Sequence, residues 1–268
     1  MLIWVSALHC EAKPVIDFYR LKKSHDDNAF DLYRGDNMAC IISGSGKVAS
    51  SAACAWIAAR YEDEASIAWI NLGTAGAAQH DLGTLFSLHQ IIDADDGQRY
   101  YPAPAIKGEL EGSACMTLSK PSEDYREDCL FDMEASGFMY ACLRFSSAEL
   151  IKSFKIVSDN RRESTGKNRQ AVSNLVHRHI DLIDQQANVL NTLNAEMAGL
   201  SPVLEHWLQL TTMAHFSQTQ KNRLRVLWRY LMNRGFDAET LLQQLGGQTA
   251  GVILANLEQH SYRDSENI

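Results

Sequence analysis

Up to about Asn160, short strand-like runs alternate with helical stretches, and this alternation is the strongest constraint on the fold. Strands are predicted over residues 2–7, 38–43, 68–72, 85–92 and 154–157, and helices over residues 12–19, 48–61 and 135–145. Such alternation is typical of an α/β fold with a largely parallel or mixed sheet. The first part of the chain is therefore expected to be an α/β domain.

The remainder of the chain shows only helical patterns. Apolar residues recur at helical spacing between residues 172 and 193. Ser201 and Pro202 suit the N-cap and the first position of a following helix. Further helices are predicted over residues 203–214, 219–233 and 238–245, the last with Asp237 as its N-cap. We therefore expect one domain over residues 1–198 and a helical extension over residues 199–268.

The charge of the chain argues against a general nucleic-acid binder, which usually has a basic surface. The formal net charge is −8, and it falls entirely within residues 1–164, because residues 165–268 contain nine basic and nine acidic residues. One stretch, residues 217–234, holds five basic residues and no acid. A nucleic-acid-contacting helix is conceivable there, but a basic solvated face opposite a packing stripe is the simpler interpretation.

Cysteine usage and hydropathy indicate a cytoplasmic protein. The six cysteines lie far apart without a Cys-x-x-Cys pair, so they are expected to be reduced thiols rather than disulfides or zinc ligands. No run of about 18 apolar residues is present, and the first strand begins directly after Met1, so neither a membrane span nor a cleavable leader is predicted.

Three acids stand where predicted elements begin or end. Glu11 follows the first strand, Glu134 opens a predicted helix, and Asp159 closes a predicted strand. Side chains at strand ends and helix starts project into the crevice of an α/β sheet, where ligands usually bind. Each acid also has a plainer explanation: the helix dipole favours Glu11 and Glu134, and Asp159 could cap a turn. Their combination at three distant positions predicts a site.

Two glycine-containing turns follow strands. Residues 43–48 lack the spacing of a phosphate-binding Walker A loop and the third glycine of a dinucleotide fingerprint, so a tight strand-to-helix turn is predicted. Residues 71–78 are similar, with Thr74 as a possible donor to a sugar or an anion. Their small side chains, including Ala75 and Gly76, would let a flat ring approach the backbone closely.

Six pieces of sequence together resemble the nucleoside phosphorylase/nucleosidase superfamily. In chain order they are the first strand with Glu11, Gly46-Lys47-Val48-Ala49, Asn71-Leu72-Gly73-Thr74-Ala75-Gly76, Asp81-Leu82-Gly83-Thr84, Met133-Glu134-Ala135 and Ser158-Asp159. The order is most similar to the branch of methylthioadenosine/S-adenosylhomocysteine nucleosidases and adenosylhopane-type phosphorylases, over roughly residues 1–195. The resemblance implies a three-layer α/β/α sandwich with a mixed central sheet, acting on nucleosides without a cofactor or metal, as a homodimer or higher homo-oligomer.

The resemblance also implies roles for individual residues. Met133 would pack on the ribose of a purine-type nucleoside, and Glu134 would accept its 2′ and 3′ hydroxyls. Asp159 would protonate N7 of the base, while Glu11 would activate the nucleophile. Thr74, Ala75 and Gly76 would line the substrate site, and Lys155 stands where these nucleosidases often carry Arg.

The nucleophile distinguishes the two activities of the superfamily. A phosphorylase must hold a dianion with cationic groups and backbone N–H groups, and Lys47, Lys155 or Arg161 could supply the cations. Glu11 in the first loop would repel phosphate and suits a water-activating base. We therefore expect a nucleosidase, with a phosphate-dependent phosphorylase as the alternative. A non-catalytic nucleoside-binding regulatory protein is the alternative from another class.

Overall fold

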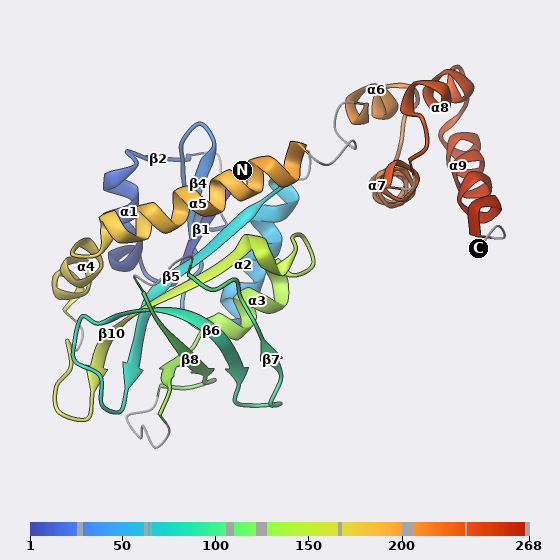
Figure 1. Cartoon of the computed structure of the whole chain (residues 1–268). Coiled ribbons are helices and arrows are strands. Elements are labelled where there is room, and N and C mark those ends of the chain that lie inside the picture. Colours follow the sequence, from blue (N-terminus) through green and yellow to red (C-terminus); the bar gives the residue numbers. More distant parts are fainter. Residues whose placement is uncertain are drawn as a thin grey trace. The chain divides into compact units, whose positions relative to one another are not determined.

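The computed structural model describes most of the chain. It covers residues 1–25, 29–61, 64, 66–105, 110–121, 128–165, 168–199, 206–233 and 235–265. The chain divides into two compact units, Met1–Ala195 and Glu196–Ile268, and Figure 1 shows the elements of each. The sequence places the boundary close by, after residue 198.

A mixed sheet forms the centre of the first unit. Its strands are β1 (Leu2–Ser6), β2 (Lys22–Lys23), β3 (Asp31–Arg34), β4 (Met38–Ile42), β5 (Ala68–Ala77), β6 (Leu85–Asp93), β7 (Arg99–Tyr100), β8 (Glu111–Thr117), β9 (Leu130–Asp132) and β10 (Ile151–Asn160). The order is β10-β6-β8-β9-β5-β1-β4-β3-β2, with β7 beside β6. Because β10 also pairs with β5, the five strands β10, β6, β8, β9 and β5 close into a ring.

Helices cover both faces of this sheet, as Figure 1 shows. They are α1 (His9–Phe18), α2 (Lys47–Arg60), α3 (Ala135–Cys142), α4 (Arg169–His177) and α5 (Ile180–Gly199), and a 3₁₀ turn, η1 (Ala148–Leu150), precedes β10. The side chains of alternate residues of β1 point to opposite faces of the sheet. Ile3 belongs to the buried cluster that includes Cys54 of α2 and Phe138 of α3, whereas the Trp4 ring lies 5.8 Å from that of Tyr19, at the end of α1. The expected α/β/α architecture with a mixed sheet is confirmed.

The extent of β5 differs from the sequence prediction. We expected a strand over residues 68–72 followed by a turn, but the strand continues to Ala77. Glycine and alanine have low intrinsic strand propensity. Parallel pairing with β10 along this length, and antiparallel pairing of Gly76 and Ala77 with β9, nevertheless hold the segment extended. Long-range pairing therefore overrides the local preference.

Several other elements also differ from expectation. The strands β2, β3, β7, β8 and β9 and the helix α9 were not predicted, and β10 continues past the expected end at residue 157. The expected continuous helix over residues 172–193 is instead two helices, α4 and α5, separated at Arg178 and His179. The imidazole of His179 contacts the Gly83 carbonyl at 2.6 Å at this break. A tertiary contact thus accompanies a turn that the apolar spacing does not reveal.

Four further helices lie in the described part of the second unit. They are α6 (Trp207–Thr212), α7 (Gln218–Asn233), α8 (Ala238–Leu245) and α9 (Ala250–Ser265). Their apolar residues form a separate core that includes Leu210, Trp228, Leu231 and Leu257, all fully buried. The predicted N-cap of α8 is confirmed, because the Asp237 carboxylate accepts a hydrogen bond from the Thr240 N–H at 2.8 Å. Ser201 and Pro202 lie outside the described residues.

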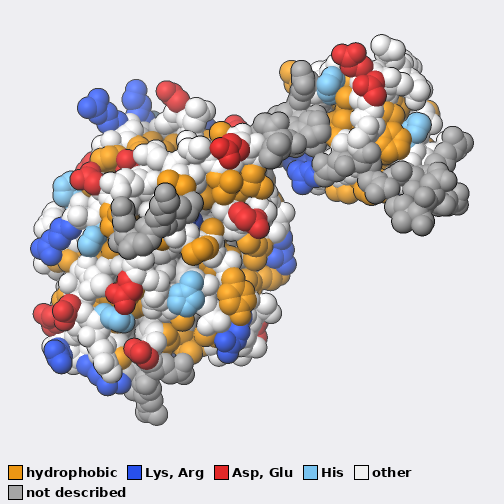
Figure 2. All heavy atoms as spheres, viewed as in Figure 1, with side chains coloured by type: hydrophobic (Ala, Val, Ile, Leu, Met, Phe, Trp, Pro, Cys, Tyr) orange, Lys and Arg blue, Asp and Glu red, His pale blue; other side chains and the backbone are white. Residues whose placement is uncertain are grey.

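The face of the first unit that Figure 2 shows is mixed in charge. Acidic and basic side chains are interspersed over this face.

Among the described residues, none of the helices combines the length and the apolar character that crossing a membrane requires.

Candidate active site

Glu11 connects the first turn of α1 to strand β5. One carboxylate oxygen, Oε2, accepts the Leu8 N–H at 3.0 Å, as a helix-start acid does. The other, Oε1, accepts both the backbone N–H and the hydroxyl of Thr74 at 2.8 Å. Glu11 is only 3% exposed. A carboxylate offers about four acceptor positions, so three bonds leave one for a ligand or a water.

Glu134 precedes the first residue of α3 and is held by the glycine turn that follows β4. Its Oε1 accepts the Gly46 N–H at 2.8 Å and the Ser45 hydroxyl at 3.0 Å. Its Oε2 has a longer contact, 3.3 Å, with the Met133 N–H. Glu134 is buried. The turn predicted as a plain strand-to-helix connection therefore positions this carboxylate, and Oε2 keeps acceptor capacity for a ligand.

The pKa of Glu134 is raised above its usual value. Burial is the main cause, and the Asp132 and Glu11 carboxylates raise it further. The Lys155 ammonium and the Gly46 N–H act in the opposite direction. Glu134 is therefore close enough to Glu11, Asp132 and Lys155 for their charges to affect its pKa.

Lys155 forms a buried ion pair with Asp132. Its Nζ lies 2.8 Å from Asp132 Oδ2, and the two side chains are 1% and 0% exposed. Asp132 also accepts the Thr117 hydroxyl at 2.7 Å and the Ala135 N–H at 2.8 Å. Burial by itself lowers the pKa of Lys155, but the carboxylates of Asp132 and Glu134 raise it overall. Lys155 is therefore a fixed cation.

Gly73 of β5 lies next to both Lys155 and Glu11. A Cβ atom built on Gly73 would lie 3.3 Å from Lys155 Nζ and 3.4 Å from Glu11 Oε1. The absence of a side chain at Gly73 thus leaves room for the ammonium and the carboxylate beside the same position of β5. Glu11, Thr74, Glu134 and Lys155, expected as site residues from the sequence, come together here.

Asp159 lies further along the same pair of strands. A bulge between Val157 and Asp159 interrupts the pairing of β10 with β5, and Asp159 then pairs with Gly76. Its carboxylate accepts the Ser158 hydroxyl at 2.7 Å, and the residue is half-buried. Three residues of strand, about 10 Å, separate Gly76 from Gly73. Asp159 therefore stands apart from the glutamates along β5 and β10.

The remaining expected residues lie in β5 or next to Glu134. Thr74, Ala75 and Gly76 are within β5, beside residues 156–159 of β10. Met133 is half-buried directly before Glu134. Sequence reasoning missed Asp132, Ser45 and Gly73. Asp132 could have been found as a third acid at the end of an apolar run, beside Met133 and Glu134.

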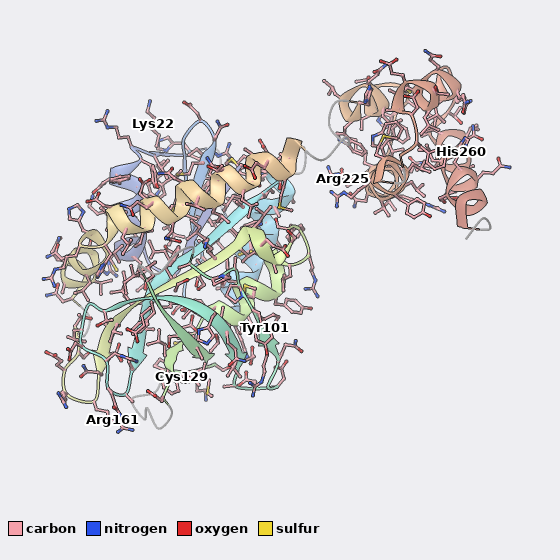
Figure 3. All side chains as sticks on the ribbon, viewed as in Figure 1. Lys22, Tyr101, Cys129, Arg161, Arg225 and His260 are labelled. Atoms are coloured by element: carbon pink, nitrogen blue, oxygen red, sulfur yellow. The ribbon has the colours of Figure 1, made fainter. Side chains whose placement is uncertain are left out.

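The other candidate cations are engaged or lie outside this cluster. Lys47 Nζ is 2.6 Å from both Asp93 Oδ1 and Asp95 Oδ2. Arg161 is exposed in the loop after β10 and points outward in Figure 3. Within the described ranges, the His, Cys, Asp and Glu side chains form no group of three or more suited to a metal ion.

Comparison with known proteins adds information about the fold. No family model matches the sequence, and none of the curated proteins matches it. Solved structures do match. The apo structure of 5′-methylthioadenosine nucleosidase from Arabidopsis thaliana has a TM-score of 0.57 and 16% identity, covering 71% of this chain and 95% of that one.

Two structures of bacterial nucleosidases also match this chain. The 5′-methylthioadenosine/S-adenosylhomocysteine nucleosidase from Helicobacter pylori, with butyl-thio-DADMe-Immucillin-A, has a TM-score of 0.57 and 9% identity, covering 70% of this chain and 97% of that one. The enzyme of the same name from Neisseria meningitidis, in complex with methylthio-immucillin-A, has a TM-score of 0.55 and 17% identity, covering 71% and 98%. The expected resemblance to the nucleoside phosphorylase/nucleosidase superfamily is therefore confirmed at the level of the fold.

Proposed function

We propose that this protein is an enzyme that cleaves the N-ribosidic bond of a purine-type nucleoside, with water as the nucleophile. The observation that carries the proposal is the charge of the buried cluster. Among the described residues, it combines the three carboxylates of Glu11, Asp132 and Glu134 with the one ammonium of Lys155. Breaking an N-ribosidic bond builds positive charge on the sugar. A fixed excess of negative charge in a water-poor site stabilises that transition state.

The two glutamates would have different roles at the sugar: Glu134 would bind the ribose and Glu11 would activate the water. Glu134 Oε2, whose present contact is the longer one to Met133, would accept the ribose hydroxyls while Gly46 and Ser45 hold Oε1 in place. Glu11 would use its remaining acceptor position to orient and deprotonate a water. The Thr74 and Leu8 donors fix its carboxylate beforehand, which lowers the entropy cost of reaching the reactive geometry.

Asp159 would act on the base. Its separation from the cluster, about 10 Å along the strands, suits a nucleoside whose ribose lies at the glutamates and whose purine extends along β5. The small residues Ala75 and Gly76 would let the ring approach the strand. Protonation of N7 makes the purine a better leaving group, and general acid catalysis of this kind contributes about 10²–10⁴-fold in rate.

The hydrogen bonds around the site favour water over phosphate. The Gly46 N–H and the Ser45 hydroxyl, which could hold an anion, are bound to Glu134. Lys155 is paired with Asp132, and Lys47 is paired with Asp93 and Asp95. A phosphate dianion would also face the excess of carboxylates. Phosphate binding there would require several of these pairs to break.

The test is base release from methylthioadenosine, S-adenosylhomocysteine, adenosine and inosine, each with and without phosphate. We expect release without phosphate from at least one of them. Asp159→Asn should lower kcat by about 10²–10⁴-fold with little change in KM, because Asp159 acts on the leaving group. Glu11→Gln should lower kcat as well, since an amide cannot take a proton from water.

Asp17→Asn is the matched control, because Asp17 is an exposed acid of α1, paired with Lys13. It should retain wild-type rates. Release that depends on phosphate would identify a phosphorylase. Binding of these nucleosides without release by the wild-type protein would contradict the enzyme proposal and favour a nucleoside-binding regulatory protein.

A further inference from the structure

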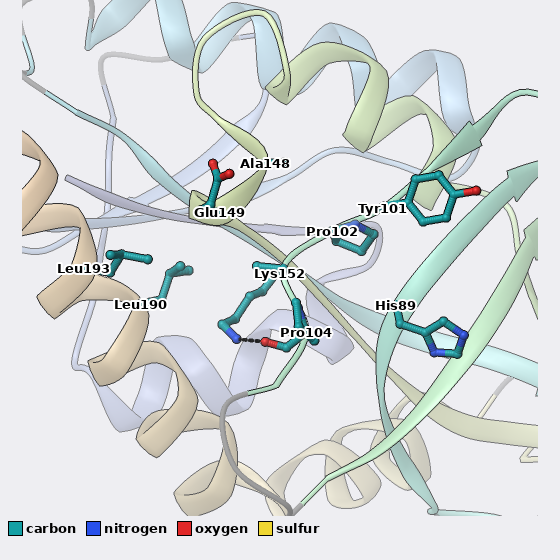
Figure 4. A pocket seen from close by; sticks show the side chains of 10 residues that line it. His89, Tyr101, Pro102, Pro104, Ala148, Glu149, Lys152, Leu190 and Leu193 are labelled. Atoms are coloured by element: carbon teal, nitrogen blue, oxygen red, sulfur yellow. Dashed lines mark hydrogen bonds between the residues drawn. The ribbon is translucent and has the colours of Figure 1, made fainter.

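A cavity lies in the first unit, and its lining includes none of the residues of the carboxylate cluster. Its volume is about 520 Å³, within the range of roughly 300–1,000 Å³ that is usual for small-molecule sites. Figure 4 shows its lining, which comes from α5, from the start of β10 with η1, from β6 and from the segment after β7. The lining residues are His89, Tyr101, Pro102, Ala103, Pro104, Ala148, Glu149, Lys152, Leu190 and Leu193.

Lys152 is the charged group inside this cavity. The residue is only 1% exposed, and its Nζ donates to the Pro104 carbonyl at 2.5 Å, as Figure 4 shows. An ammonium has three donors. Within the described part of the chain, the bond to Pro104 is the one hydrogen bond that Lys152 Nζ makes. Burial lowers the pKa of Lys152 to about 8. At pH 7 the side chain is therefore still charged in most of the molecules.

Lys152 contrasts with Lys155 on the same strand. Residues three apart in a strand point to opposite faces of the sheet, so the side chains of the two lysines point to opposite faces. Lys155 has the Asp132 carboxylate at 2.8 Å. No ion pair joins Lys152 to an acid among the residues described, and Glu149 is exposed at the rim of the cavity. A buried ammonium without a counter-ion is costly.

We propose that this cavity binds a small carboxylate that carries an apolar chain. The carboxylate would accept hydrogen bonds from Lys152 and supply the missing negative charge. The chain would lie against Leu190 and Leu193 of α5 and the prolines of residues 101–104. A hydrogen-bonded ion pair at one end and apolar walls around the rest define this ligand class.

The test uses the full-length protein and two matched probes, octanoate and the uncharged octanamide, in calorimetric titrations at pH 7. Octanoate should bind with one site per chain, and octanamide should bind at least about tenfold more weakly, because it cannot pair with the ammonium. Lys152→Met keeps a similar side-chain volume without the charge. It should weaken octanoate binding by the same factor and leave octanamide binding nearly unchanged.

Two further variants keep the test decisive. Ala103→Trp fills the cavity and should abolish binding of both probes, whereas Lys13→Met removes an exposed lysine of α1 and should leave binding unchanged. Thermal melting confirms that each variant is folded. Failure of octanoate to bind the wild-type protein overturns the proposal. Equal binding of octanoate and octanamide, or unaltered octanoate binding by both cavity variants, overturns it as well.

Discussion

At the scale of single residues, the site depends on how each buried charge is compensated. Glu11 accepts three hydrogen bonds from Leu8 and Thr74, and Glu134 is held by Gly46 and Ser45. Asp132 and Lys155 instead compensate each other directly. Removing one partner of a buried pair leaves the other charge without compensation, which costs far more than the pair itself contributes.

Asp132→Asn should therefore lower the free energy of unfolding by about 3–5 kcal/mol, because Lys155 stays buried without its main counter-ion. Urea unfolding followed by circular dichroism measures this change. Asp17→Asn breaks the exposed pair of Asp17 with Lys13 and should cost less than about 1 kcal/mol. Similar losses in the two variants would show that the buried pair has no special role.

At the scale of elements, the contact between α2 and α3 positions Glu134 in the proposed site. Gly46 stands at φ 100°, a conformation that favours glycine, and its N–H binds Glu134 just before α3 begins. Gly137 in the first turn of α3 lies so close to α2 that an added Cβ would overlap the Lys47 carbonyl. The Ser51 hydroxyl donates to the Gly137 carbonyl at 2.8 Å across the same contact.

Gly137→Ala should push α2 and α3 apart, and overpacking of this kind costs about 1–3 kcal/mol. The same displacement would disturb the bond between Gly46 and Glu134, so base release should fall together with the melting temperature. Gly251→Ala is the control, because a Cβ at this helical glycine of α9 meets no atom within 4 Å. It should not destabilise the protein, and any gain should be smaller than the value of about 0.5–1 kcal/mol for a mid-helix position. A harmless Gly137→Ala would contradict this view of the contact.

At the scale of the whole molecule, the chain combines two units with separate cores. The compared nucleosidases cover 70–71% of this chain, and the first unit ends at Ala195 of 268 residues. The second unit has its own buried cluster, in which Trp228 and Leu231 of α7 are fully buried. Arg225 of α7 stacks over the Trp207 ring at 5.2 Å, and Arg223 pairs with Glu258.

Residues 196–268 produced alone should therefore be helical and should melt cooperatively, since the apolar residues of this core all belong to the second unit. Circular dichroism against temperature measures this. Leu231→Ala in the same fragment should cost about 2–5 kcal/mol, which is enough to unfold a unit of this size. A fragment without a cooperative transition would show that the two units depend on each other for folding.

The sequence predicted some features of the fold and the site better than others. Its periodicities indicated the α/β class and the helices α7 and α8 to within a residue. The short strands β2, β3, β7 and β9 have too few residues for a periodic signal. Glu11, Thr74, Glu134 and Lys155 were expected and are neighbours. Their partners Asp132, Ser45 and Gly73 were missed, because hydrogen bonding and close approach across the chain leave no local pattern.

The sequence by itself determined what local chemistry controls: the alternation of strands and helices, the helical extension, the cap at Asp237, and the acids at element ends. Only the tertiary structure decided the length of β5, the hydrogen bond from the Gly46 N–H to Glu134, and the cavity around Lys152. The physical reason is that periodicity and capping depend on neighbours in sequence. Strand pairing, burial and charge compensation depend instead on residues that only the folded chain brings together.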